Sequence, residues 1–183
     1  MRRPVLLSLI CTLVFAGVAG STTVIPPTFD SLVSKAGTIF VGEVVDQRAY
    51  WVTTPDGRAI RTLVVFKVED VWKGSVGAVT QLDFLGGTIG DTTMEVIGMP
   101  AFRVGQRSVL FVAAERAASP LVGFMHGRMR VERDGSGVDR VRTHDGRSLG
   151  GVNQVGAQRP NYMLSITPMR LSDLASAVKA RMQ

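Results

Sequence analysis

Two long runs of alternating apolar residues dominate the first half of the chain. Residues 38–45 and 63–72 are rich in β-branched and aromatic side chains, and the turn-forming residues 54–57 lie between them. This pattern predicts an antiparallel β-hairpin. The second run has one apolar face and one face that becomes charged near its end, which favours a sheet with a core on one side and solvent on the other.

Shorter apolar runs predict more strands further along the chain. The stretch 109–114 is apolar on both faces, so we expect it to be a central strand. Two glycines within 121–131 indicate a bend or bulge in that strand. The complete set of additional predicted strands is 79–85, 94–97, 109–114, 121–131 and 138–143.

Helices are predicted only at the two ends of the domain. Thr28 is a candidate N-cap for a short helix that stops at Gly37. A second helix is predicted over 168–182, with Thr167 as its cap and Pro168 at its first position. About seven short strands without βαβ alternation predict a mainly β fold, specifically a small antiparallel OB-like β-barrel with these two flanking helices.

The first 21 residues have the three regions of a secretory signal peptide. Two arginines precede an apolar stretch, and small residues follow it. We therefore expect a signal peptide over 1–21, a single domain over 22–183, and a secreted or periplasmic location. No stretch of the mature chain approaches the roughly 18 apolar residues of a membrane span. Cys11 is the only cysteine, so the mature domain is expected to have no thiol chemistry.

Positive charge is concentrated in the second half of the chain. Residues 21–100 carry 6 basic and 9 acidic side chains, whereas residues 101–183 carry 13 basic and 6 acidic ones. By strand alternation, one face of the hairpin over 124–143 is expected to carry Arg128, Arg130, Arg140 and Arg142. Two interpretations stay open, a solvated face screened by nearby carboxylates and a surface that docks an acidic partner or an anionic glycan. Nucleic acid is not expected, because few aromatic residues lie among the arginines.

Catalytic and metal-binding motifs are not found in the sequence. The chain has two histidines, with no nucleophile elbow and no zinc-type spacing near them. His144-Asp145-Gly146 is interpreted as a turn, and His126 as a packed strand residue. We therefore predict no cofactor, no metal site and no enzyme activity. If the protein were an enzyme that used these histidines, replacing either one by alanine would abolish its activity while the protein stayed folded.

Three segments together resemble the netrin-like domain. These segments are 35–44, 65–74 and 102–112, and the resemblance covers about residues 29–131. The netrin-like domain is the barrel of tissue inhibitors of metalloproteinases and of many exported bacterial proteins. The resemblance implies an OB-like barrel. The animal inhibitors chelate the protease zinc with an N-terminal cysteine, and this chain has no cysteine after Cys11.

The sequence therefore predicts a non-enzymatic exported binding domain. Its loops at the barrel rim would recognise a protein partner, with a secreted protease among the candidates. The alternative is a module that binds an envelope polysaccharide or another anionic surface. In that alternative Tyr50 and Trp51 would form an exposed aromatic patch beside the arginines, whereas ordinary packing at the rim is the other interpretation of these two residues.

Overall fold

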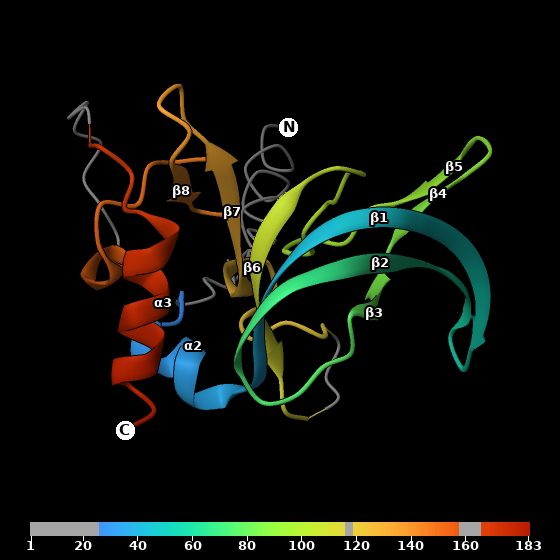
Figure 1. Ribbon diagram of the computed structural model, residues 1–183. Coiled ribbons are helices and arrows are strands. Elements are labelled where there is room, and N and C mark those ends of the chain that lie inside the picture. The colour runs from blue at the N-terminus through green and yellow to red at the C-terminus, as the bar shows by residue number, and fades with distance from the viewer. Residues whose placement is uncertain (1–25, 116–118, 158–165) are drawn as a thin grey trace, which may run out of the picture.

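A six-stranded antiparallel sheet forms the centre of the protein in a computed structural model, which describes residues 26–115, 119–157 and 166–183. The strands lie in the order β3-β2-β1-β6-β7-β8, and a separate two-stranded hairpin, β4–β5, lies beside the sheet (Figure 1). This arrangement confirms the mainly β, antiparallel prediction. The strands are β1 (Ala36–Thr54), β2 (Gly57–Lys73), β3 (Val79–Leu85), β4 (Gly87–Ile89), β5 (Thr92–Met94), β6 (Arg107–Ala113), β7 (Arg128–Arg133) and β8 (Asp139–Arg142).

The predicted hairpin is confirmed and is longer than its apolar runs suggested. β1 and β2 pair antiparallel from Ile39 and Lys73 to the turn at Thr54 and Gly57. The register shifts at three points along β1, which indicates bulges. Bulges bend a strand and increase its twist. The far half of the hairpin accordingly curves strongly away from the rest of the sheet (Figure 1).

The sheet separates two apolar cores. Ile39, Val109 and Phe111 point toward α2 (Phe29–Lys35) and α3 (Leu171–Ala180). The opposite face has its own core, with Phe40, Phe66, Phe84, Phe102 and Leu110 among its members. Strand β6 lies between β1 and β7 and is buried on both faces, as predicted for a central strand.

The first helix begins as the sequence predicts. The Thr28 side chain accepts a hydrogen bond from the backbone N–H of Ser31, which is the N-cap arrangement. The helix ends at Lys35, and the chain continues directly into β1. The cap prediction is therefore confirmed, while the stop lies two residues before the predicted Gly37.

The C-terminal helix is shorter than predicted. It spans Leu171–Ala180 rather than 168–182, and Arg170 is its N-cap residue instead of Thr167. The preceding residues are held in an extended conformation because Met169 donates to the Leu149 carbonyl and accepts from the Val141 N–H. The backbone N–H and C=O groups of Met169 therefore have hydrogen-bond partners without being part of a helix. The predicted apolar stripe does pack inward, with Leu174 and Val178 buried.

Two predicted strands are corrected by the structure. The segment 121–131 contains a 3₁₀-helix, η1 (Phe124–Gly127), and β7 begins only at Arg128. Gly123 and Phe124 both have positive φ values, 64° and 58°, which interrupt an extended strand there. The predicted strand 94–97 is wrong as well, because β5 ends at Met94 and a turn follows.

The closed barrel is not confirmed. β3 and β8 are the two edges of the sheet, and no ladder joins them among the residues described. The predicted signal peptide and Cys11 lie outside the described residues. Within the described ranges, none of the helices is long and apolar enough to cross a membrane.

Candidate functional site

The two predicted aromatic residues do not form a common patch. Tyr50 pairs with Arg61 in the β1–β2 ladder, and Trp51 pairs with Ile60, so the two aromatic side chains project from opposite faces of the hairpin. The Tyr50 hydroxyl donates to Asp83 at 2.9 Å, and this carboxylate raises the pKa of Tyr50. Trp51 is partly exposed and is stacked by the Arg58 guanidinium at 4.4 Å.

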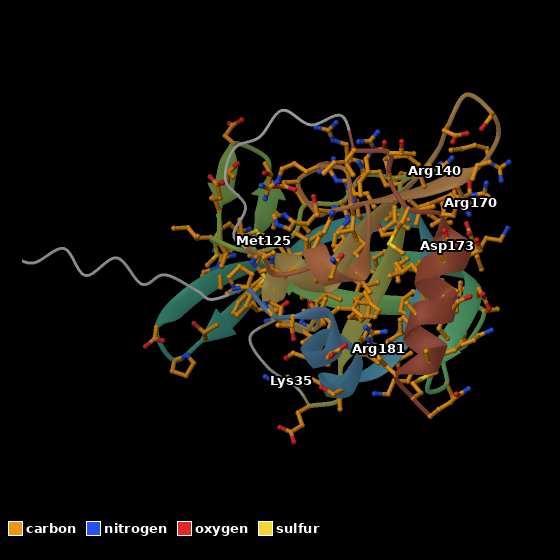
Figure 2. All side chains as sticks on the ribbon, turned by 90° about the vertical axis from the view of Figure 1, so that its left-hand side faces the viewer. Lys35, Met125, Arg140, Arg170, Asp173 and Arg181 are labelled. Atoms are coloured by element: carbon orange, nitrogen blue, oxygen red, sulfur yellow. The ribbon has the colours of Figure 1, made fainter. Side chains whose placement is uncertain are left out.

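The outer arginines of the predicted cationic face are paired with carboxylates. Arg140 Nε lies 2.8 Å from Asp134 Oδ2, and Arg142 Nε lies 2.7 Å from Glu132 Oε2. Figure 2 shows Arg140 at the end of the sheet near the start of α3. Arg130 pairs with Arg142 across the β7–β8 ladder, so the predicted shared face exists. Its positive charge is nevertheless largely neutralised within the protein, which favours the screened, solvated interpretation.

Arg128 is an internal structural residue and not a surface contact. Its side chain is 2% exposed, which corrects the prediction that it faces a partner. The guanidinium stacks on the Phe102 ring at 4.4 Å and donates to Ser108 Oγ, Gln106 Oε1 and the Ala101 carbonyl. Burial lowers the pKa of Arg128 to about 10, and the nearby Arg130 contributes to this shift. Arg128 thus fixes the loop between β5 and β6.

A large apolar groove lies under the curved part of the hairpin. Its volume is about 760 Å³, within the roughly 300–1,000 Å³ range of ligand-binding clefts. The floor includes Val64, Phe84 and Phe102, and Glu95 is its only charged lining residue among the residues described. The surface that we call the groove is lined by residues 47, 49, 62, 64, 84–88, 94–102 and 125.

Ile97 stands at the rim of the groove and is almost fully exposed. Its exposed fraction is 97%, the highest among the large apolar residues of the described chain. Ile97 occupies the second position of a β-turn in which the Met99 N–H donates to the Val96 carbonyl at 3.1 Å. Gly98 at the third position has a φ of 85°, which is typical of a type II turn.

The turn that presents Ile97 is attached to a second element. The Gly98 carbonyl accepts a hydrogen bond of 2.9 Å from the Met125 N–H of η1. Phe124, beside Met125, is partly exposed and holds a positive φ, an uncommon conformation for a bulky residue. The rim therefore consists of two segments joined by a hydrogen bond, the turn at 96–99 and η1, which hold the backbone of Ile97 in a defined position.

The groove wall is tied to the hairpin as well. The Gly86 N–H donates to the Ile60 carbonyl at 2.7 Å, and Thr62 Oγ1 donates to the Gly86 carbonyl at 2.7 Å. The Ile60 N–H also contacts the Met94 sulfur at 3.3 Å. These contacts fix the start of β4 and the end of β5 against β2, so the groove is preformed.

The two histidines, which no sequence motif connects, lie against each other. The His126 and His144 ring centroids are 5.0 Å apart, edge to face. Burial lowers the pKa of both imidazoles, and the Asp145 carboxylate opposes this shift. His144 does lie in a turn, as predicted, because the Gly146 N–H donates to the Thr143 carbonyl. Across the described ranges, no group of three or more residues is arranged to hold a metal ion.

Sequence reasoning misses both the groove rim and the histidine pair. Ile97 falls within a predicted strand, although Gly98 and Pro100 directly after it are residues that favour turns. That signal could have placed Ile97 at a turn. The histidine contact joins η1 to the turn after β8, and only the pairing of β7 with β8 brings these segments together.

The chain has no matching relative that could assign the site. No family model, no curated protein and no solved structure matches it. The functional interpretation therefore depends on the physical properties of the site, namely an apolar preformed groove and an exposed apolar side chain at its rim.

Proposed function

We propose that this protein is a non-enzymatic exported binding domain that takes an apolar segment of a protein partner into the groove. The observation that carries this proposal is the exposed Ile97 at the rim of a largely apolar, preformed cleft. Contiguous apolar surface that forms an exposed groove is typical of interaction sites, and Ile97 extends the apolar lining of this groove to its rim. The signal-peptide pattern over 1–21 supports export.

The hydrogen bonds of the rim favour a role for Ile97 in binding over exposure on a flexible loop. Ile97 is held by the turn hydrogen bond and by the bond between Gly98 and Met125. Because these bonds hold the backbone of the turn, that backbone loses less conformational entropy when a partner binds. Met99 and Met125 line the groove on either side of this contact. Methionine adapts its shape to an apolar partner surface, so the groove suits a peptide segment with bulky aliphatic side chains.

We also propose that the domain is OB-like and netrin-like. The strong curvature of the β1–β2 hairpin and the helices at both ends support this assignment. The resemblance implies binding by loops at one end of the sheet, which is where the groove lies. A secreted protease is the partner class that the resemblance suggests.

The alternative of an envelope polysaccharide or anionic-surface module has less support. Its residues are spread over different surfaces, since Tyr50 and Trp51 face opposite sides of the hairpin. Arg128 is buried, and the guanidinium groups of Arg140 and Arg142 already have carboxylate partners. These residues do not form one exposed cationic or aromatic surface.

A partner capture experiment with matched variants tests the proposal. The mature wild-type domain, Ile97→Asp and Val104→Asp are each immobilised and exposed to envelope and culture-medium fractions. Val104 is a suitable control because it is a 60% exposed aliphatic residue that does not line the groove. We expect one protein to be retained by wild type and by Val104→Asp, and to be lost with Ile97→Asp.

Two results would overturn the proposal. One is retention of the same proteins by all three domains, and the other is retention of no protein by any of them. Circular dichroism of each variant establishes that it is folded, because an exposed substitution of this kind changes stability by only about 0.5 kcal/mol.

A further inference from the structure

A second, smaller cavity lies beside β7 and the turn after β8, where His126 lines it and the adjacent Met125 lines the groove. It has a volume of about 120 Å³, and its lining includes Pro27, His126, Arg128, His144, Arg147 and Ser148. One water molecule takes up roughly 30 Å³ in the liquid. The cavity therefore has room for a few waters or for a small ion, and not for a sugar or a nucleotide.

The two imidazoles in this cavity are available to a ligand. Each histidine is half-buried, and within the described ranges neither side chain makes a hydrogen bond to the protein. A neutral imidazole carries one N–H donor and one acceptor, and a protonated imidazole carries two donors. Both histidines line the cavity, so an imidazole N–H that points into it can donate to a ligand there.

The charges around the cavity are mostly positive. Arg130 has no carboxylate partner among the described residues, and its buried Nε atom makes no hydrogen bond there. Arg130 lies near the cavity loop, because a Cβ atom added to Gly146 would be 3.5 Å from its Nη1. The positive charge of Arg130 contributes to the lowered pKa of His144. Arg130 is half-buried and does not itself line the cavity, so its charge acts on the cavity from nearby and favours a negative ligand there.

Asp145 is the carboxylate nearest the histidines, and it is already bonded. Its Oδ2 lies 2.7 Å from Arg147 Nε, and Thr143 Oγ1 donates to its Oδ1. Asp145 raises the pKa of both imidazoles, whereas Arg147 lowers it. One carboxylate, which is already paired, thus lies beside a cavity that is lined by both histidines, Arg128 and Arg147, with Arg130 nearby.

We propose that this cavity binds a small oxyanion, held by the His126 and His144 imidazoles and by the charges of Arg147 and Arg130. The proposal concerns a different site from the groove and does not depend on the proposed partner binding. Each imidazole donates an N–H to an anion oxygen. Because protonation adds a donor and a positive charge to each ring, binding strengthens as the pH falls through the histidine pKa values.

Sulfate is the probe for the first test, because its charge is constant between pH 5 and pH 8. Sulfate is titrated into the mature domain at constant ionic strength, balanced with sodium chloride, and the His126 and His144 ring signals are followed by NMR. We expect saturable shifts of both rings, with a dissociation constant at least fivefold lower at pH 5.5 than at pH 8. Formate, titrated in the same way, shows whether a planar carboxylate binds as well as a tetrahedral anion.

Arg147→Gln is the decisive variant, because this side chain is exposed and lines the cavity. We expect sulfate binding to weaken about fivefold or more, as for a charge contact near a protein surface. Arg48→Gln is the matched control, since Arg48 is exposed on β1 and outside the cavity. In the double variant His126→Gln with His144→Gln, the pH dependence of binding should disappear.

The proposal is overturned if the histidine shifts are linear in sulfate, which would indicate a general salt effect. It is also overturned if Arg147→Gln binds sulfate as tightly as Arg48→Gln. Should the double histidine variant fail to fold, the wild-type titration and the two arginine variants still decide the matter.

Discussion

At the end of the sheet formed by β7 and β8, most surface arginines are paired with carboxylates, with Arg130 an exception among the described residues. At the end formed by the β1–β2 hairpin and β4–β5, apolar side chains stay exposed. At the first end Arg140 and Arg142 have carboxylate partners. At the second end Ile97 is almost fully exposed. Residues that make their contacts within the chain are explained by the fold alone, and residues that do not are better candidates for binding.

The two ends also differ in their charged residues, which are mostly paired with one another at the first end and nearly absent from the groove at the second. Arg107 lies between Glu69 at 2.7 Å and Asp139 at 3.0 Å, and these hydrogen bonds raise its pKa, with Glu69 the larger cause. The groove, by contrast, has Glu95 as its only charged lining residue among those described. A net positive sequence therefore does not by itself indicate a cationic docking surface. Substitutions at each end test whether the two ends differ in this way.

The largest effect is expected for Arg128→Ala, because Arg128 connects the two ends. The substitution removes the stacking on Phe102 and the bond to the Ala101 carbonyl, so the loop that forms part of the groove loses several of its attachments. We expect the free energy of unfolding to fall by about 2–4 kcal/mol, measured by urea denaturation. Arg48→Ala, at an exposed position on β1, is the control. A loss no greater than the control would show that Arg128 is dispensable.

A smaller effect is expected for Gly98→Ala at the groove. Gly98 has a φ of 85°, so alanine strains the turn that presents Ile97. The expected loss is about 1–3 kcal/mol, and partner retention should fall as well. Gly135→Ala is the control in the β7–β8 turn, because no atom lies within 4 Å of the added Cβ. Equal losses of stability in the two variants, measured by thermal unfolding, would contradict the role assigned to Gly98 in this turn.

A smaller, pH-dependent effect is expected for Asp134→Asn. Hydrogen bonds from Ser136 and then from Arg140 hold the pKa of Asp134 well below its ordinary value of 3.8. Because the folded-state pKa is lower than that of the unfolded chain, this stabilisation is present above pH 3.8 and is lost as the pH falls further. The variant should therefore be less stable than wild type at pH 7, and the difference should narrow as the pH falls below 3.8. A constant difference from pH 7 to pH 2 would contradict this linkage.

The smallest effect is expected for the ion pair between Glu132 and Arg142. This pair is partly exposed, so a double-mutant cycle with Glu132→Gln and Arg142→Gln should give a coupling energy of about 0.2–1 kcal/mol. The coupling should decrease at high salt. A coupling that does not change with salt would indicate that packing, and not charge, joins the two side chains.

Local features are predictable from the sequence because their causes are local. The Thr28 cap and the β1–β2 hairpin with its turn at 54–57 follow from residue preferences and alternation. The shared face of Arg130 and Arg142 also follows from alternation. The ion pair of Arg142 with Glu132 does not follow from alternation, because the position of a guanidinium depends on which carboxylate lies beside it in the folded sheet.

Features that depend on two distant segments cannot be found in this way. Ile97 is held at the rim because Gly98 is bonded to Met125, which lies 27 positions later in the sequence. The helix predicted over 168–182 begins late because Met169 pairs with residues of the sheet edge. In both places a tertiary hydrogen bond overrides the local preference of the chain.

Strand β1 supplies side chains to both cores, with Ile39 on one side and Phe40 on the other. Formation of the two cores is therefore coupled, since both need the same strand in place. The β1–β6 ladder also joins residues far apart in sequence, such as Ile39 and Phe111. Long-range pairing of this kind slows folding to about milliseconds to seconds. The domain is thus expected to unfold in a single cooperative transition and to refold slowly.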